Sequence, residues 1–273
     1  MNDARGEEFL ERSPLFGPLR VYGGAILSKR RPCLEDLQRL LAAREPRLTT
    51  RSGAPLSFVA QGRRPNSFEE KYEPRTYLKG EVQIRRDHWH DCFNALVWLT
   101  FPQSKAALNE RHYRALLEQR AAGSPNRGPV QDAMTLFDEG GVIVAARDHE
   151  LLRLIEGFAW KDLFWRNRAR VTADMGFYLF GHALYEKALH PFTGITARGV
   201  LFEVETGFFA RPLSVQLERL DAMLAARLLD AGRLRSTREL VPVPILGVPG
   251  WCADNARESY YDNLDYFRSG RRH

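Results

Sequence analysis

The sequence has few cysteines and no long uninterrupted apolar segment. Cys33, Cys92 and Cys252 stand far apart and form no CxxC pair, which fits a reducing compartment better than a disulfide framework. No run approaches the roughly 18 apolar residues of a membrane-spanning helix. The acidic N-terminus also lacks the apolar core of a signal peptide. These absences predict a cytoplasmic protein that has no membrane partner.

Lysine is also scarce, since only six of the 40 basic residues are lysines. The net charge is +6, but the arginines are dispersed, and the main basic blocks are Lys29–Arg31, Arg63–Arg64 and Arg271–Arg272. A nucleic-acid site gathers its basic residues on one face or along one stripe. We therefore expect a solvated, arginine-rich surface and no specific nucleic-acid partner.

The common catalytic signatures are missing as well. The sequence contains no GxSxG nucleophile elbow, no P-loop and no GxGxxG turn, so no motif defines a nucleophile or a nucleotide site. It also lacks the HExxH pattern of zinc hydrolases. Any active site must be sought in less specific groupings of polar residues.

The most informative stretch runs from His88 to Tyr113. Histidine, aspartate, asparagine and lysine side chains alternate here with tryptophans and phenylalanines. Surface helices rarely carry so many aromatic residues, and core helices rarely carry so many polar ones. Polar groups set among aromatic ones indicate either the lining of a pocket or a buried hydrogen-bonded network.

Two helices are expected in this stretch. Asp91 is placed to cap a helix over residues 92–99, because its carboxylate can accept from the free N–H groups of the first turn. Pro102 suits the first turn of a second helix, which would end near Ala121. Lys105, Asn109 and His112 then lie at i, i+4 and i+7 on one face of that second helix. An exposed polar face explains such a stripe more often than the lining of a site does.

A second polar interruption occurs in the apolar segment over residues 177–189. If this segment is helical, His182 and Glu186 lie at i and i+4 on one face. The simplest interpretation is a core histidine that is hydrogen-bonded to the glutamate of its own helix. The alternative is that both side chains belong to a site.

The remaining pattern predicts an α+β fold that is mainly helical, with a few short strands. Residues 138–141 are expected to form the turn of a hairpin with acidic residues at its tip, and the proline-rich segment 242–251 an irregular loop packed on the body. We expect an irregular lead-in over 1–31 and a single globular domain over 32–270. Further helices are expected after Pro32, from Asp148 to about Trp160 and over 214–229, and strands over 54–60, 82–86, 141–146 and 196–206.

Several motifs, in this order, resemble those of a bacterial family of domains of unknown function. They are WHDxFNALVW from Trp89, FPxxKAxxN from Phe101, FDExG from Phe137, FGHALxEK from Phe180 and LGxPGW from Leu246. The resemblance covers roughly residues 70–270 and implies a single continuous domain, without implying an activity. It also implies a larger apolar residue in relatives where this chain has Cys92, which argues against a thiol nucleophile. The polar residues that it places in the common pattern are His90, Asp91, Asn94, Lys105, Asn109, Asp138, Glu139, His182 and Glu186.

Three uses of these polar residues stay open. A divalent metal could bind His88 and His90, which point the same way if extended, together with His182 and Glu186. Metal-free acid–base chemistry could instead use the histidines and the acidic pair at 138–139, with Lys105 as an anchor for an anion. In the third interpretation the domain is non-catalytic, and the polar groups are structural.

The favoured function is a hydrolase-like enzyme acting by acid–base or metal-assisted chemistry on a small-molecule ligand. The alternative is a non-catalytic binding or interaction domain, and the sequence leaves the oligomeric state open. The candidate catalytic residues are His90, Asp91, His182 and Glu186. The candidate substrate-binding residues are Asn94, Lys105, Asn109, His112, Asp138 and Glu139.

The two polar interruptions are predicted to meet. Both the segment His90–Asn94 and the segment His182–Glu186 lie in apolar, aromatic surroundings, where an unpaired polar group costs about 1–3 kcal/mol. This cost is avoided most simply if the two segments satisfy each other, a bound ion or a ligand in a common pocket.

Overall fold

A four-stranded sheet lies at the centre of the fold. In the computed structural model, which describes residues 10, 13–22 and 31–270, the strand order is β4-β3-β5-β6. The central pair is parallel, and each outer strand is antiparallel to its neighbour. The strands are β3 (Gly141–Ala146), β4 (Met175–Leu179), β5 (Thr196–Glu203) and β6 (Val241–Pro244).

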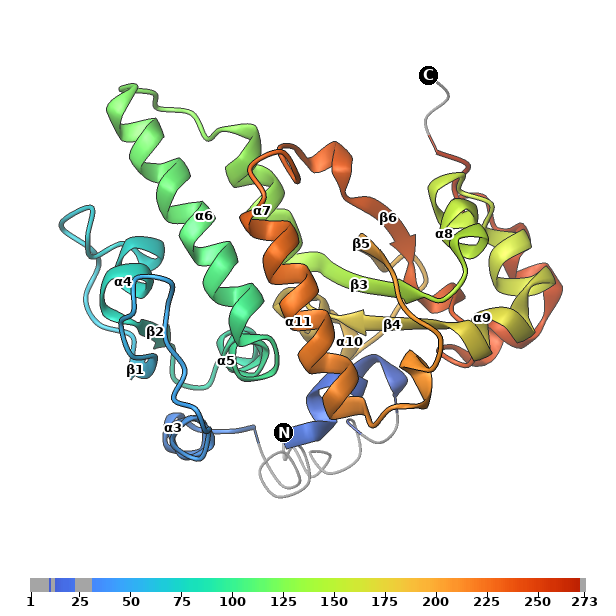
Figure 1. Ribbon diagram of the computed structural model, residues 1–273, viewed down its shortest axis with the longest axis horizontal. Helices are drawn as coiled ribbons and strands as arrows, with labels where there is room; N and C mark the ends of the chain where they lie inside the picture. Colours follow the sequence, from blue (N-terminus) through green and yellow to red (C-terminus); the bar gives the residue numbers. More distant parts are fainter. Residues whose placement is uncertain (1–9, 11–12, 23–30, 271–273) are drawn as a thin grey trace.

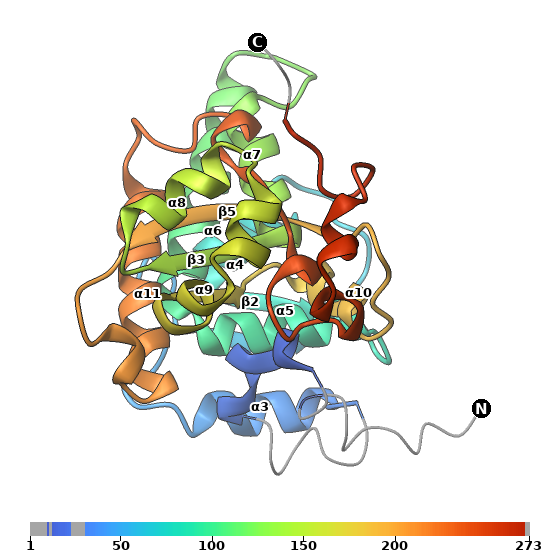
Figure 2. The same ribbon diagram turned by 90° about the vertical axis from the view of Figure 1, so that its right-hand side faces the viewer.

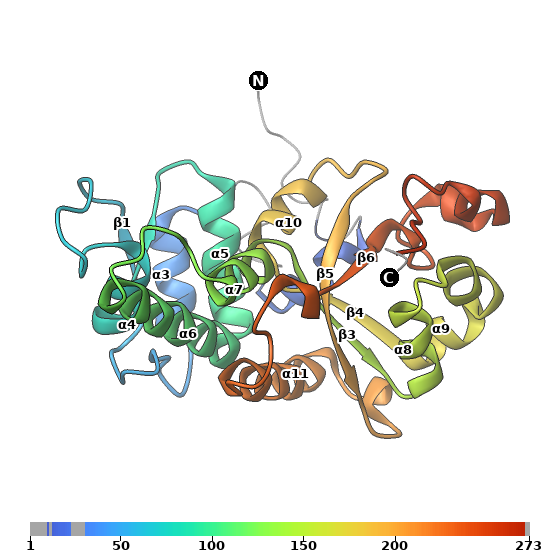
Figure 3. The same ribbon diagram turned by 90° about the horizontal axis from the view of Figure 1, so that it is seen from above.

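Helices cover both faces of this sheet. In Figure 3, α7 and α11 lie on one side and α8 and α9 on the other; α8 and α9 stand in front of the strands in Figure 2. All six residues of β3 are buried as a result, as expected of a strand covered on both faces. The helices are α3 (Leu34–Ala42), α4 (Tyr72–Lys79), α5 (Trp89–Thr100), α6 (Pro102–Ala121), α7 (Pro129–Gly140), α8 (His149–Glu156), α9 (Arg168–Asp174), α10 (His182–Ala188) and α11 (Leu213–Leu229), with a π-helical turn η2 (Asp162–Arg166).

Helix α6 is fixed at its N-terminus by a buried carboxylate from α11. Asp221 accepts hydrogen bonds from the backbone N–H groups of Gln103 (3.0 Å) and Ser104 (2.8 Å), two of the donors that have no partner within a helix. Burial raises the pKa of Asp221 to about 6. This contact ties together α6 and α11, which pack side by side (Figure 1).

A smaller unit stands beside this helical layer (Figure 1). Strands β1 (Ser57–Ala60) and β2 (Glu81–Ile84) pair in parallel, and α4 connects them. The connection ends at Gly80, whose φ of 72° and close approach to the backbone of Pro55 exclude a side chain. Strand β2 then leads directly into α5, on which the polar residues of the candidate site begin.

The structure confirms the predicted fold class, a mainly helical α+β fold with short strands. Helices α6 and α11 and strand β3 lie where the sequence placed them. Helix α8 and strand β5 begin as predicted but end earlier, at Glu156 rather than near Trp160 and at Glu203 rather than at residue 206. None of the helices in the described part of the chain is long and apolar enough to cross a membrane.

Two local predictions in the polar stretches were wrong. The hairpin turn predicted at 138–141 is instead the last turn of α7, so Asp138 is buried in a helix rather than exposed at a tip. Asp91 does not cap a helix, because α5 begins earlier, at Trp89, with His88 as its N-cap. In both cases tertiary packing overrides the local turn or capping signal.

Two segments expected to be irregular contain regular structure. Residues Pro14–Tyr22 of the predicted lead-in form a 3₁₀ helix, η1, which buries Phe16 against Phe93 of α5; the rest of the lead-in lies mostly outside the described residues. The proline-rich tail contains β6, an edge strand, where proline is tolerated because no donor is needed on the outer side. After it come the short 3₁₀ turns η5 (Ile245–Gly247), η6 (Ala253–Ala256) and η7 (Glu258–Asp262); η3 (Phe208–Ala210) and η4 (Thr237–Glu239) precede it.

Gly181 joins β4 to α10 and thereby places His182. A Cβ atom at this position would lie 2.4 Å from the carbonyl oxygen of Glu139 and 2.5 Å from the backbone nitrogen of Gly141. Because both neighbours are backbone atoms, Gly181→Ala should lower the free energy of unfolding by on the order of 1–3 kcal/mol. Gly62→Ala is the control, since nothing lies within 4 Å of a Cβ there. Equal urea-unfolding midpoints for the two variants would contradict the close approach at Gly181.

Candidate functional site

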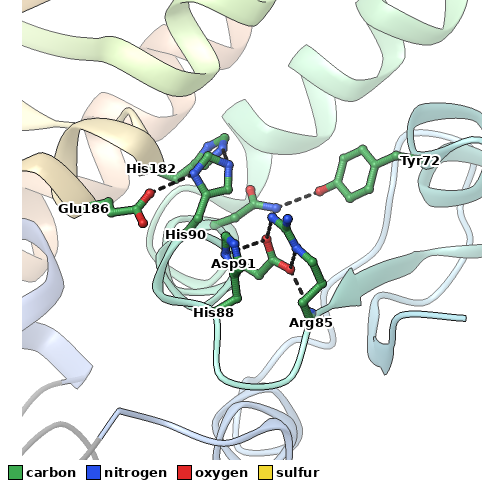
Figure 4. A network of polar contacts seen from close by, with 8 residues as sticks. Tyr72, Arg85, His88, His90, Asp91, His182 and Glu186 are labelled. Carbon is green, nitrogen blue, oxygen red and sulfur yellow. Dashed lines mark hydrogen bonds and ion pairs between the residues drawn. The ribbon is translucent and has the colours of Figure 1, made fainter. Parts of the chain in front are cut away.

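The two polar segments meet between α5 and α10, as the sequence predicted. His90 lies in the first turn of α5 and His182 is the first residue of α10. Their Nε2 atoms are 2.9 Å apart, and the two rings stand nearly perpendicular, at 84°. Figure 4 shows the two imidazoles in contact. A direct histidine–histidine hydrogen bond therefore links segments that are 92 residues apart.

Glu186 of α10 also contacts this histidine pair, and its partner is His90 of α5. Its Oε2 atom lies 3.2 Å from Nδ1 of His90, whereas the sequence suggested a hydrogen bond to His182 of its own helix. The side chain of His90 is 27% exposed and that of Glu186 42% exposed, while His182 is buried. The row Glu186–His90–His182 therefore leads from solvent into the interior.

A second, buried row of polar groups lies beyond His182. Lys105 Nζ donates to Oδ1 of Asp138 and, at 2.8 Å, to Oδ1 of Asn94. Asn94 in turn donates to the hydroxyl of Tyr72 at 2.7 Å. The ammonium group also lies 5.6 Å from the ring centroid of Trp98, a favourable cation–π distance.

Lys105, Asn109 and His112 are all buried, so the exposed polar face that the sequence favoured is wrong. Their common face of α6 is instead packed against other elements. Asn109 donates to the carboxylate of Glu73 on α4 at 2.6 Å. His112 lies further along the same helix and is buried on the same face.

The two rows meet at Asp138. Its Oδ2 atom lies 3.7 Å from Nδ1 of His182, too far for a good hydrogen bond. The backbone of Asp138 also interacts with this imidazole and favours its protonated form. Burial acts to raise the pKa of Asp138, but the charge and the hydrogen bond of Lys105 oppose it, and the pKa lies below its ordinary value. Asp138 is therefore ionised at neutral pH.

Unlike Asp138, His182 is uncharged at neutral pH, because burial has the largest effect on its pKa. Burial lowers its pKa to about 4, and the charges of Lys105 and His90 act in the same direction, although Asp138 opposes them. A neutral imidazole has one N–H donor and one acceptor nitrogen. If Nδ1 carried no proton, its lone pair would face the Asp138 carboxylate without a donor between them, so the proton belongs on Nδ1.

This assignment fixes the protons of the whole row. With its proton on Nδ1, His182 accepts at Nε2, so His90 donates from its own Nε2. The contact between Nδ1 of His90 and Glu186 then needs a proton of its own, carried either by the ring or by the carboxyl group. One exchangeable proton therefore lies between His90 and Glu186, at the solvent-exposed end of the row.

The other candidate residues do not join this row. Asp91 accepts from the backbone N–H and the guanidinium of Arg85 at 2.6–2.8 Å (Figure 4), which ties β2 to α5. Burial acts to raise the pKa of Asp91, but the hydrogen bonds from Arg85 outweigh it and lower the pKa. Glu139, the next residue of α7 after Asp138, is exposed and lines a separate hollow.

Tyr72 and Arg85 are the residues of the network that the sequence did not single out as site residues. Neither stands in a motif that marks a site, because their partners Asn94 and Asp91 come from another element. Cys92 is buried in the first turns of α5, as predicted, and burial raises the pKa of its thiol to about 12. Its thiol is therefore protonated at neutral pH and is a poor nucleophile.

The histidines and carboxylates do not form a metal-ligand set. Within the described ranges no group of three or more His, Cys, Asp or Glu side chains is arranged to hold an ion. His88 does not stand parallel to His90; the rings are nearly perpendicular, and His88 faces Asp91. The geometry thus fits the acid–base interpretation better than the metal-assisted one.

Fold and site together define a mainly helical α+β domain with a partly exposed histidine–glutamate pair beside a buried ion pair. The family model described as "Protein of unknown function (DUF3025)" matches residues 56–271, and the chain belongs to this family. No curated protein and no solved structure matches the chain.

The depressed pKa of His182 predicts a pH-dependent stability. The unfolded chain binds a proton at this residue near pH 6.5 and the folded chain only near pH 4, so stability rises with pH between these values. His182→Gln should abolish this contribution, on the order of 3 kcal/mol, which is measured by urea unfolding from pH 4 to 7.

The comparison with the variant is essential because Asp221 has the opposite effect. Its folded-state pKa is raised from 3.8 to about 6, so it lowers stability as the pH rises through the same range. Only the difference between wild type and His182→Gln isolates the histidine. Parallel stability profiles for the two proteins would contradict a neutral, buried His182.

The Lys105–Asp138 pair predicts strong coupling between two buried charges. Lys105→Met leaves the carboxylate of Asp138 buried without its cation and should destabilise the fold by about 3–5 kcal/mol. Adding Asp138→Asn should restore most of this loss, as a double-mutant cycle in denaturant will show. Lys161→Met is the control, because Lys161 and Asp262 form an exposed pair and its loss should leave stability nearly unchanged. Additive effects at 105 and 138 would rule out the coupling.

Proposed function

We propose that this protein is a metal-free acid–base enzyme, with a hydrolase-like reaction on a small molecule. The observation that carries the proposal is the 2.9 Å contact between Nε2 of His90 and Nε2 of His182, with Glu186 on the remaining nitrogen of His90. Both nitrogens of His90 are occupied, so the more exposed carboxyl group of Glu186 is the one that exchanges a proton with the substrate.

The proton transfer runs along the exposed end of the row. As a general acid, Glu186 gives the substrate the proton that it shares with Nδ1 of His90, which leaves the pair with one proton fewer. As a general base, the pair in that deprotonated state takes one proton from the substrate or from a water molecule and holds it again between Glu186 and Nδ1 of His90. His90 keeps its second proton on Nε2 throughout, because His182 accepts from it.

The buried residues have a positioning role in this proposal. The negative charge of Asp138 favours the tautomer of His182 that accepts from His90, and it stabilises the positive charge that His90 gains with the proton. Lys105 keeps Asp138 ionised. Asn94 holds Lys105 in place through a 2.8 Å hydrogen bond. Such fixed groups cost little reorganisation when the proton moves.

The proposal also includes a bacterial origin, a cytoplasmic location and the lack of a specific nucleic-acid partner. The motifs support a bacterial origin and extend the family assignment to individual polar residues. The few, unpaired cysteines support a cytoplasmic location, and the dispersed arginines support the absence of a specific nucleic-acid partner.

A panel of chromogenic substrates tests the proposed function. The wild-type protein is assayed with p-nitrophenyl acetate, p-nitrophenyl phosphate and bis-p-nitrophenyl phosphate across a range of pH. Glu186→Gln and His90→Gln should each lower kcat/KM for the hydrolysed substrate by at least about 100-fold, the usual contribution of general acid–base catalysis.

Glu203→Gln is the matched control, because Glu203 forms an exposed pair with His149, at 3.6 Å, outside the network. It should leave kcat/KM unchanged. Melting temperatures show whether each variant stays folded. If Glu186→Gln lowers activity only in proportion to the folded fraction, or if no substrate is hydrolysed above the Glu186→Gln background, the non-catalytic alternative is correct.

A further inference from the structure

A second site candidate is a hollow lined by residues of α7, α10, the segment after α10 and the start of β5; α7 packs against both α10 and β5. Its volume is about 270 Å³, slightly below the roughly 300–1,000 Å³ that suits drug-sized ligands. A hollow of this size is suited to a small metabolite. Its lining combines apolar side chains with charged ones, namely Leu136, Glu139, Gly140, Ala183, Leu184, Lys187, Phe192, Gly194, Ile195, Thr196 and Arg198.

The charged groups of this hollow are not paired with each other. Lys187 and Arg198 have no carboxylate within 4.0 Å among the described residues, and Glu139 has no cation within that distance. Some exposed cations elsewhere form pairs, such as Lys161 with Asp262. Positively and negatively charged side chains therefore line the same hollow without forming a salt bridge with each other.

The apolar side chains of the lining can hold an apolar group of a ligand. Leu184 and Ile195 are buried beneath the hollow, and Phe192 is 56% exposed, the second most exposed of the large apolar side chains described. An aromatic ring exposed beside separated charges is suited to hold an apolar group of a ligand whose charged groups are also separated.

We propose that this hollow binds a small zwitterion of the amino-acid class with an apolar side chain. Its carboxylate lies between Lys187 and Arg198, and its ammonium group faces Glu139. Arg198, a half-buried residue, can bind a carboxylate through two parallel hydrogen bonds, and it thereby gains a partner for its guanidinium. The apolar side chain of the ligand contacts Phe192 and the leucines.

The hollow is separate from the acid–base row, although both use α7 and α10. Asp138 and His182 face the row, whereas their chain neighbours Glu139 and Ala183 line the hollow. Binding in the hollow does not require proton transfer at His90. The two proposals can therefore fail independently.

Calorimetric titration with L-leucine tests the ligand class. The full chain should bind L-leucine, and it should bind N-acetyl-L-leucine and L-leucinamide at least tenfold more weakly, because each lacks one of the two charges. Absence of binding at millimolar L-leucine would overturn the proposal. Equal binding of L-leucine and its N-acetyl derivative would also overturn it, since the site would then recognise a simple anion.

Variants test the location. Arg198→Gln and Glu139→Gln should each weaken L-leucine binding at least tenfold, with melting temperatures that show both variants to be folded. Arg153→Gln is the control, because Arg153 is an exposed arginine of α8 on the other side of the sheet. His90→Gln should also bind normally, which separates this site from the proposed acid–base chemistry. An equal loss in Arg153→Gln, or no loss in Arg198→Gln, would place the binding elsewhere.

Discussion

The buried carboxylate of Asp138 governs the arrangement of the polar residues around it. An ionised carboxylate in the interior is unfavourable unless a cation and hydrogen bonds compensate it. Lys105 supplies the cation, and Asn94 holds the cation in position. The same negative charge decides which nitrogen of His182 carries its proton. The proton on His90 and the exchangeable proton at Glu186 follow from that choice.

The backbone brings these side chains together through two tight junctions. The chain turns from α5 into α6 at Phe101 and Pro102, so residues of both helices face the same interior region. The second junction is Gly181, whose close approach to the end of α7 places His182 beside Asp138. Without these two junctions, the polar residues of α5, α7 and α10 would be buried separately, each without a partner.

Much of the fold could be predicted from the sequence, because the apolar periodicities of the long elements are clear. The 20 residues of α6 begin at Pro102 as expected, β3 shows the apolar run of a central strand, and β5 shows the alternation from which it was predicted. The errors occur where local signals conflict with packing. Gly140 and Gly141 suggested a hairpin turn, yet the helix continues to Gly140 because Phe137 and Asp138 are buried against neighbouring elements.

The sequence by itself determined that polar residues interrupt two apolar segments, and that the cost of burying them unpaired requires a partner. It could not determine which partner each residue has, because hydrogen bonds form between atoms that are close in space rather than in sequence. Glu186 shares a helix face with His182 but bonds to His90, and Asp91 bonds to Arg85 rather than to the row. Only the tertiary structure, by fixing the distance between α5 and α10 and the burial of Asp138, decided which residues form the candidate site.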